Sequence, residues 1–208
     1  MLKGAGAKGF CAGGDVREVH RLAKNGDSRW LAFFVDEYRL DYALHKFPKP
    51  VVALLDGISM GGGMGLGQAA RLRIVTERSK IAMPETRIGF LPDVGATRFL
   101  SVMPAEVELY VGLTGVTLSG ADALRLQLAD LCVPAEWLGT FEERLQRMSH
   151  AGDLMAAFAR RVRAAVQHHS ACCIGAVYAV DSAAFRPALE HRADRRHVAS
   201  RSGARACA

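Results

Sequence analysis

The sequence predicts an α/β protein in which a strand-bearing part is followed by a helical part. Two short apolar runs, at residues 51–55 and 72–75, have the length and composition of strands buried on both faces of a sheet. A glycine cluster at 61–67 separates them and leads into residues of helical composition. Later in the chain, apolar residues recur at helical spacing. We therefore expect a core at residues 1–103, a helical region at 104–190 and a tail at 191–208.

Length and composition indicate a globular protein. With 208 residues, of which 50% are hydrophobic and 23% are charged, the chain is long enough for one domain with a sizeable core. It contains no apolar stretch long enough to cross a bilayer, so we expect no membrane segment. No charged-then-apolar signal sequence opens the chain, and we expect a cytoplasmic location.

The formal net charge of +6 comes mostly from the tail. Between residues 191 and 208, five arginines outnumber one aspartate and account for +4 of that charge. The rest of the chain is nearly neutral, so the charge does not indicate that the fold binds nucleic acid. We expect the tail to be disordered.

A glycine loop lies near the start of the chain. Residues 4–9 match the spacing GxGxxG, which in dinucleotide-binding proteins follows a strand and opens a helix. Only three residues precede the loop, and residues 8–12 lack helical composition, so we do not expect NAD binding. Cys11 lies nearby, but it has no histidine close to it in the sequence, and we do not assign it as a nucleophile.

Two helices are expected before the first long apolar run. Residues 15–24 and 30–47 carry apolar side chains at three- and four-residue steps, with a break at Gly26 and Asp27. In the second segment the repeated positions include several aromatic side chains. Because aromatic residues at this spacing usually belong to a core, we expect them to be buried.

The glycine cluster at 61–67 is open to two interpretations. Glycine lets the backbone adopt unusual angles and lets a ligand approach the main chain closely. The first N–H groups of the following helix lack internal partners, so this turn suits a developing negative charge on an oxygen atom. Close packing of a helix on a strand also requires glycine, and the pattern alone does not decide between the two.

Two carboxylates follow apolar segments. Glu85 comes directly after a predicted strand at 80–83 and Pro84, and Asp93 lies eight residues later, before a predicted helix at 94–100. Taken alone, Glu85 is typical of a surface acid or a helix-cap partner, and Asp93 of a helix cap. Two acids beside a glycine-rich anion site can also divide the roles of base and positioning group.

The remaining residues predict helical packing. A helix at 106–113 ends at Gly115, and the pattern Ser119–Asp122 is a capping box that opens another helix. A short strand or extended link is expected at 130–133. Further helices are expected at 136–148 and 154–168. None of these segments carries residues that indicate chemistry.

Three stretches in combination resemble the enoyl-CoA hydratase/isomerase superfamily, the crotonase fold. They are GFCAGGD at 9–15, GISMGGGMGLG at 57–67 and MPETRIGFLPDVG at 83–95, and the likeness covers roughly residues 4–133. It implies an α/β crotonase-like spiral of ββα units with a helical C-terminal half. The chain looks most like the 3-hydroxyisobutyryl-CoA hydrolases. Hydratases carry a catalytic Glu where this chain has Gly65, whereas the hydrolases add an Asp that matches Asp93.

The resemblance also implies roles for individual residues. The N–H groups of Gly14 and Gly62 would form an oxyanion hole. Glu85 would act on the thioester carbonyl, as a nucleophile or through an activated water. Asp93 would hold the 3-hydroxyl group of the substrate or assist the water. Other residues implied to contact the substrate or CoA are Ala12, Gly13, Gly61 and Gly65.

The function implied is hydrolysis of a small acyl-CoA thioester, with 3-hydroxyisobutyryl-CoA of valine degradation as the expected substrate. No metal or other cofactor is needed, because CoA is part of the substrate, and a homo-oligomer is expected. Two alternatives stay open. One is hydration or isomerisation of an enoyl-CoA, and the other is an inactive family member or interaction subunit.

Two further expectations follow from the resemblance. The chain is similar to a family member without its opening strands, which would expose a sheet edge. The aromatic helix at 30–47 would lie over the active site in this family, so its side chains are alternatively expected to line an acyl pocket.

Overall fold

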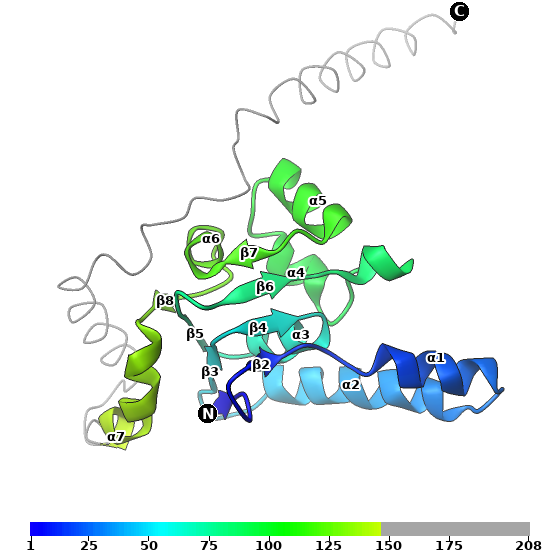
Figure 1. Cartoon of the computed structure of the whole chain (residues 1–208), viewed down its shortest axis with the longest axis horizontal. Helices are drawn as coiled ribbons and strands as arrows, with labels where there is room; N and C mark the ends of the chain where they lie inside the picture. Colours follow the sequence, from blue (N-terminus) through cyan, green and yellow to red (C-terminus); the bar gives the residue numbers. More distant parts are fainter. Residues whose placement is uncertain (147–208) are drawn as a thin grey trace, which may run out of the picture.

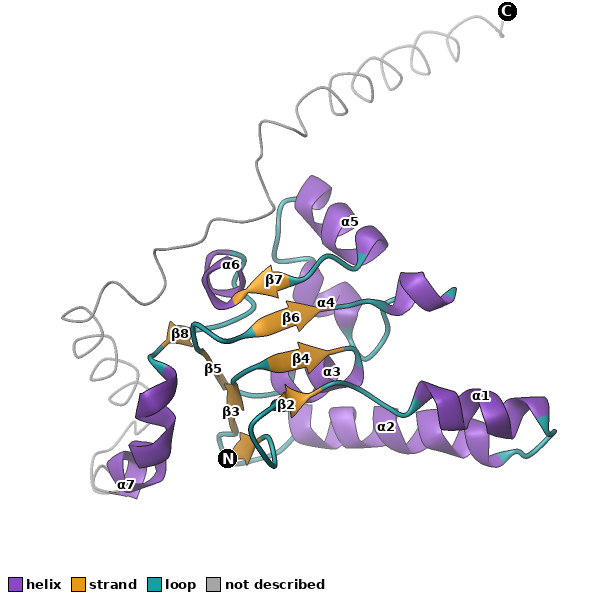
Figure 2. Ribbon diagram, in the orientation of Figure 1, coloured by secondary structure: helices purple, strands orange, loops and turns teal. Residues whose placement is uncertain are grey.

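The computed structural model describes residues 1–146, which form two four-stranded sheets (Figures 1 and 2). The first sheet is entirely parallel, and its strands in spatial order are β1 (Leu2–Lys3), β3 (Val52–Leu55), β5 (Leu72–Val75) and β8 (Leu131–Cys132). In the second sheet the last strand is antiparallel to its neighbour, and the order is β2 (Gly9–Cys11), β4 (Ile58–Met60), β6 (Lys80–Ala82) and β7 (Leu118–Ser119).

The chain alternates between the two sheets. β1 leads to β2, β3 to β4 and β5 to β6, and each pair is followed by helical structure. The turn from β3 to β4 needs glycine at position 57, where φ is +67° and a Cβ would lie 2.7 Å from the carbonyl oxygen of Lys8. This arrangement confirms the predicted spiral of ββα units. β1 and β2 are the edge strands of the two sheets.

Helices connect and cover the strands. The α-helices are α1 (Val16–Lys24), α2 (Arg29–His45), α3 (Gly62–Gln68), α4 (Ala96–Leu100), α5 (Ala105–Thr114), α6 (Gly120–Arg125) and α7 (Phe141–Gln146). Two 3₁₀ helices are η1 (Glu85–Ile88) and η2 (Ala135–Thr140). α1 and α2 lie side by side and project from the sheets (Figure 1).

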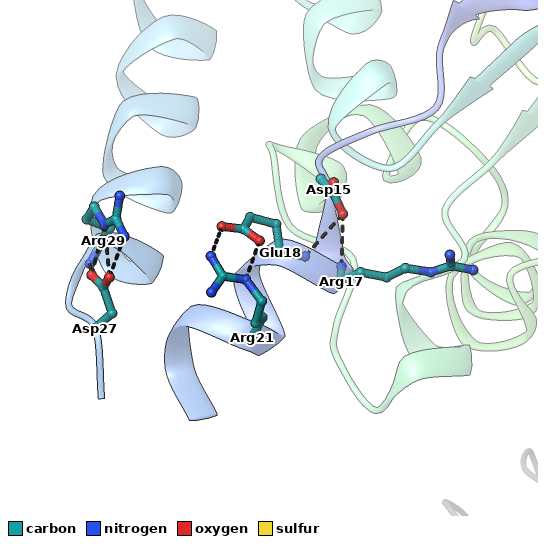
Figure 3. Close-up of polar contacts among 6 residues, drawn as sticks. All are labelled: Asp15, Arg17, Glu18, Arg21, Asp27 and Arg29. Atoms are coloured by element: carbon teal, nitrogen blue, oxygen red, sulfur yellow. Dashed lines mark hydrogen bonds and ion pairs between the residues drawn. The ribbon is translucent and has the colours of Figure 1, made fainter. Parts of the chain in front are cut away.

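The α1–α2 hairpin is fixed by local polar contacts (Figure 3). The Asp15 side chain accepts hydrogen bonds from the N–H groups of Arg17 and Glu18, each at 3.1 Å, and caps α1. The Asp27 side chain accepts a 3.0 Å hydrogen bond from the N–H of Arg29, the first residue of α2, whose N-cap residue Ser28 makes no side-chain cap bond. The side-chain cap therefore sets the start of α1 only. The ion pairs drawn in the same view are exposed and contribute little to stability.

The core lies between the two sheets and the helices. All four residues of β3 are buried, as expected for a strand covered on both faces. β7 and β8 come from the region at 104–190 and complete the two sheets, which adds strands to a region predicted chiefly as helices. The predicted capping box of Ser119 and Asp122 is present at α6. Among the described helices, none is long and apolar enough to span a membrane.

The helices predicted at 94–100 and 106–113 are confirmed as α4 and α5. The helix predicted at 136–148 is divided into η2 and α7 in the described part of the chain. The helix predicted at 154–168 and the tail at 191–208 lie outside the described residues.

One packing prediction is wrong. The aromatic residues of α2 were expected in the core, yet no residue of this helix is buried within the described chain. Instead Phe34 contacts Trp30, Phe33, Tyr38 and Phe90 in a partly exposed aromatic group. α2 belongs to a projecting hairpin in which it packs on α1 and α3, so much of its surface stays exposed (Figure 1).

Candidate active site

The N-terminus of α3 is the centre of the candidate site. Gly61 has a φ of +54°, and its N–H donates a 3.2 Å hydrogen bond to the carbonyl oxygen of Ala82 at the end of β6. This bond holds the turn against the second sheet. Among the described residues, the next N–H, that of Gly62, has no acceptor. It is a free donor at a helix N-terminus, which suits a negatively charged oxygen.

The loop after β2 lies against this turn. Gly13 has a φ of +92°, and a Cβ there would lie 3.3 Å from the nitrogen of Gly62. Gly14 packs on the ring of Phe33, where a Cβ would overlap the ring. The structure thus brings Gly13 next to Gly62, with Gly14 one residue further along the loop, while Ala12 is exposed at the end of the strand. The oxyanion-hole role of Gly14 and Gly62 and the CoA contacts of Ala12, Gly13 and Gly61 stay predictions.

Close packing of helix α3 on strand β2, the second interpretation of the glycine cluster, is observed at Gly63. A Cβ on Gly63 would overlap the carbonyl oxygen of Cys11 in β2. Helix and strand can therefore approach closely only because residue 63 has no side chain. The structure thus confirms close packing at Gly63, while the anion-binding role of the free donor at Gly62 stays a prediction.

Glu85 is buried beside the α3 turn. Its side chain is 8% exposed, and its Oε1 would lie 3.0 Å from a Cβ built on Gly61. Its Oε2 is buried and has no hydrogen-bond partner among the described residues. Burial raises the pKa of Glu85, and the charges of Asp93 and Glu37 add to the rise. The alternative of a surface acid is therefore wrong for Glu85.

Asp93 faces the same region from the loop before α4. The hydroxyl of Tyr38 on α2 donates a 2.6 Å hydrogen bond to Oδ2 of Asp93. The helix-cap alternative is wrong, because Gly95 is the N-cap residue of α4 and makes no side-chain cap bond. Between them Val94 has a φ of +41°, which is strained for a β-branched residue.

Sequence reasoning missed two further carboxylates, Glu37 and Asp41. A Cβ on Gly62 would overlap Oε1 of Glu37, and a Cβ on Gly65 would lie 2.7 Å from Oδ2 of Asp41. Burial, followed by the charge of Asp93, raises the pKa of Glu37. The two acids lie one helical turn apart on α2, and this four-residue spacing was the signal available in the sequence.

Glycines 61, 62 and 65 therefore each leave room for a carboxylate. These carboxylates come from η1 and α2, and Asp93 lies within electrostatic range of all three. Among the described residues, no group of three or more histidine, cysteine, aspartate or glutamate side chains has the arrangement of a metal site. Burial, together with the charges of neighbouring carboxylates, raises the pKa of Glu37, Asp41 and Glu85.

A cavity of about 1330 Å³ adjoins these acids. Asp41, Asp93, Gly65 and Tyr38 line it, together with residues at the C-terminal ends of α2 and α3, whereas Glu85 and Gly62 do not. Asp41 and Asp93 thus stand between the cavity and the α3 turn. Tyr38 and Tyr42 face this cavity, so the aromatic helix lines a pocket, which was the second interpretation of its pattern.

Comparison with known proteins identifies the family. The family model described as "Enoyl-CoA hydratase/isomerase" matches residues 1–198. The chain belongs to this family. A solved structure of an enoyl-CoA hydratase from Rhodobacter sphaeroides 2.4.1 superposes with a TM-score of 0.66 at 41% identity, covering 71% of this chain and 44% of that one. The predicted crotonase-type α/β fold is confirmed.

Two curated proteins are similar in sequence. One is "3-hydroxyisobutyryl-CoA hydrolase, mitochondrial" of Xenopus tropicalis, 44% identical over 148 residues, which are 71% of this chain and 38% of that protein. The other is "Small ribosomal subunit protein mS47" of Neurospora crassa, 42% identical over 152 residues, which are 72% of this chain and 30% of that protein. The chain thus spans less than half the length of these two proteins.

The predicted cytoplasmic location is wrong. It depended on the lack of a recognisable signal sequence, yet the Xenopus tropicalis hydrolase is named as mitochondrial. A secretory signal and a mitochondrial address have different compositions, so the absence of one pattern did not exclude the other.

Replacing Tyr38 by phenylalanine tests how Asp93 is held in this family member. The substitution removes the donor to Asp93 Oδ2 and leaves ring packing in place. A hydrogen bond to a charged group is worth about 1.5–3 kcal/mol, and this one is partly exposed, so we expect the free energy of unfolding to fall by about 1 kcal/mol. Urea unfolding of Tyr38→Phe, Asp93→Asn and the double variant checks this. Fully additive effects would contradict the coupling.

The raised pKa of Asp41 makes the stability of the folded chain depend on pH. Burial, with the charges of Glu37 and Asp93, raises the pKa of Asp41 from 3.8 to about 7. The folded state holds this proton more tightly than the unfolded chain. The contribution of protonated Asp41 to the free energy of unfolding is therefore fully present below pH 3.8, and it is lost as the pH rises through about 7.

We expect Asp41→Asn to stabilise the folded chain at pH 8 by about 1–2 kcal/mol, a value reduced for the solvent that reaches part of the residue. The gain should be much smaller at pH 4. Urea unfolding of both proteins at the two pH values measures it. An equal effect at both pH values would exclude a buried, ionising Asp41.

Proposed function

We propose that the chain hydrolyses a small acyl-CoA thioester, and that 3-hydroxyisobutyryl-CoA is its substrate. The observation that carries the proposal is the placement of Glu85. This buried carboxylate has an unpaired oxygen and lies beside a glycine turn in which, among the described residues, the N–H of Gly62 has no acceptor. The hydrolase from Xenopus tropicalis, named for this reaction, supports the choice of substrate.

The geometry suits attack on a thioester carbonyl. The N–H groups of Gly62 and Gly14 would donate to the carbonyl oxygen as it becomes negative, and each such donor is worth about 2.7–4 kcal/mol in comparable sites. Glu85 would attack the carbonyl carbon or deprotonate a water that attacks it. The C–S bond then breaks and CoA leaves as a thiolate. If an acyl-Glu85 anhydride forms, water hydrolyses it and restores the carboxylate.

Asp93 would position the acyl group or the water. Its Oδ2 already accepts a hydrogen bond from Tyr38, which leaves Oδ1 for a substrate hydroxyl or a water. Every group in this scheme belongs to the chain or to the substrate, so we propose that the reaction needs no additional cofactor. We also propose a mitochondrial location, as the name of the Xenopus tropicalis relative suggests. The homo-oligomer expected from the sequence stays a prediction.

The experiment is CoA release by the purified full-length chain. 3-Hydroxyisobutyryl-CoA is supplied, the free thiol is followed with a thiol-reactive dye, and water addition to crotonyl-CoA is measured alongside by loss of enoyl absorbance. The proposal expects thiol release and little hydration, because Gly65 supplies no second acid. Hydration without thiol release would instead support an enoyl-CoA hydratase, as the Rhodobacter sphaeroides protein is named.

A second candidate function belongs to another class. The mS47 protein of Neurospora crassa is named as a ribosomal subunit protein, which favours a structural subunit as the alternative. The two are separated by the same assay. A folded chain that neither releases thiol nor hydrates crotonyl-CoA would favour the subunit and contradict the hydrolase.

A further inference from the structure

Asp41 is a buried carboxyl group without a partner. Both of its oxygens are inaccessible to solvent and neither makes a hydrogen bond within the described part of the chain. A Cβ built on Gly65 would lie 2.7 Å from Oδ2 and 3.1 Å from Oδ1. The carboxyl group therefore lies directly against the backbone of α3, in space that any other residue at position 65 would fill.

The groups around Asp41 do not compensate its charge. Glu37 on its own helix and Asp93 on the loop before α4 act on it as negative charges. The Tyr38 hydroxyl donates to Asp93 rather than to Asp41. The basic residues that line the same cavity are His45, Lys49, Arg71 and Arg98, and none of them makes a hydrogen bond to Asp41. With burial, these conditions raise the pKa of Asp41 to about 7, so it keeps a proton in much of the protein near neutral pH.

Such a group is costly unless something pairs with it. Leaving a buried polar atom without a hydrogen bond destabilises a protein, and native structures contain few such atoms. A second unpaired acid points to the same region, since Glu85 is 8% exposed and its Oε2 also lacks a partner. Asp41 lines the cavity of about 1330 Å³, although its two oxygens are covered, so a small movement of the side chain would bring them to a ligand there.

We propose that Asp41, rather than Asp93, binds a hydroxyl group on the acyl part of the substrate and so selects hydroxylated acyl thioesters over unsubstituted ones; Asp93 is then left to hold the water. This inference rests on the proposed acyl-CoA function. A hydroxyl both donates and accepts hydrogen bonds, so it pairs with a carboxyl group in either protonation state. An acyl carboxylate would meet Glu37, Asp41, Glu85 and Asp93 and be repelled. An unsubstituted alkyl group would leave both Asp41 oxygens unpaired.

Binding to an inactive variant tests the proposal without requiring turnover. Titration calorimetry compares 3-hydroxyisobutyryl-CoA with isobutyryl-CoA, which lacks the hydroxyl, on the full-length chain carrying Glu85→Gln. We expect this chain to prefer the hydroxylated ligand by about ten-fold or more. Adding Asp41→Ala should reduce the preference to less than about two-fold. Adding Asp41→Asn, which keeps a donor and an acceptor in place, should retain most of it.

A control variant on the same helix separates binding from general charge. Asp36 is exposed, at 76% of its side chain, and pairs only loosely with Arg39 at 3.7 Å. Asp36→Asn should leave the preference unchanged. An undiminished preference in the Asp41→Ala variant would overturn the inference, as would failure of the folded chain to bind either ligand.

Failure of the proposal for Asp41 can be distinguished from failure of the hydrolase proposal, because two different quantities are measured. Thiol release by the chain with intact Glu85 reports on hydrolysis alone. If release occurs while Asp41→Ala leaves the ligand preference intact, the hydrolase proposal holds and the role of Asp41 is excluded. If the preference depends on Asp41 but no thiol is released, Asp41 binds the acyl hydroxyl in a site that does not hydrolyse the thioester.

Discussion

Glu85→Gln should reduce CoA release by about 10²–10⁴-fold, the range expected when a general base or nucleophile is removed. Glutamine has nearly the same shape and fits the site beside Gly61, so the fold should persist. It cannot attack the carbonyl or take a proton from water. Initial rates of thiol release from 3-hydroxyisobutyryl-CoA at saturating and at low substrate concentration measure the loss in kcat and in kcat/KM.

The pH profile gives an independent check on Glu85. Burial raises the pKa of this carboxyl group above its ordinary value of 4.5, and only the ionised form can act as base or nucleophile. Activity should therefore fall as the pH decreases through the raised pKa, at a higher pH than for an exposed glutamate. An acid limb at or below pH 4.5 would contradict this environment.

A surface glutamate provides the matched control. Glu18 is exposed on α1, where it pairs with Arg21 (Figure 3). Glu18→Gln makes the same chemical change away from the site and should leave the rate within about two-fold, because exposed ion pairs are weak. If Glu85→Gln retained a rate similar to that of Glu18→Gln, the assignment of Glu85 as the reacting carboxylate would be wrong.

Two of the four carboxylates, Glu85 and Asp93, could be predicted from the sequence because their positions depend on nearby residues only. Glu85 and Asp93 each follow an apolar segment closely, so their places at the ends of elements could be read from one window of residues. Glu37 and Asp41 lie within a helix whose polar and apolar residues both recur every three or four positions. Only the approach of α2 to α3 in space distinguishes their side from the solvent side.

The aromatic residues of α2 were misjudged for a related reason. Helical spacing of Phe34, Tyr38 and Tyr42 showed that they share a side of the helix, but not what covers that side. In the structure that side meets the cavity and the loop of Phe90. The strands and glycine turns were predicted well, because apolar runs and glycine clusters constrain the backbone directly.

Gly63→Ala should be strongly destabilising, and it tests the contact on which the whole site depends. The new Cβ would overlap the carbonyl oxygen of Cys11, a backbone atom of β2. A flexible side chain could move away, but this atom moves only with its strand. Overpacking of this kind costs about 1–3 kcal/mol, and we expect the upper end of that range. At roughly 2–4 °C per kcal/mol for a chain of this size, the melting temperature should fall by about 6–12 °C.

A second Gly→Ala change in a helix separates this clash from the general effect of alanine. Gly112 in α5 has ordinary space around it, since a Cβ would lie 3.6 Å from the nearest atom, Cδ1 of Leu100. Gly112→Ala should therefore stabilise the protein by about 0.4–1 kcal/mol, because alanine restricts the unfolded chain. Thermal unfolding of both variants measures the contrast. Because β2 leads directly to Gly13 and Gly14, a Gly63→Ala chain that still folds should also lose thiol release, whereas equal stability of both variants would exclude the close contact between α3 and β2.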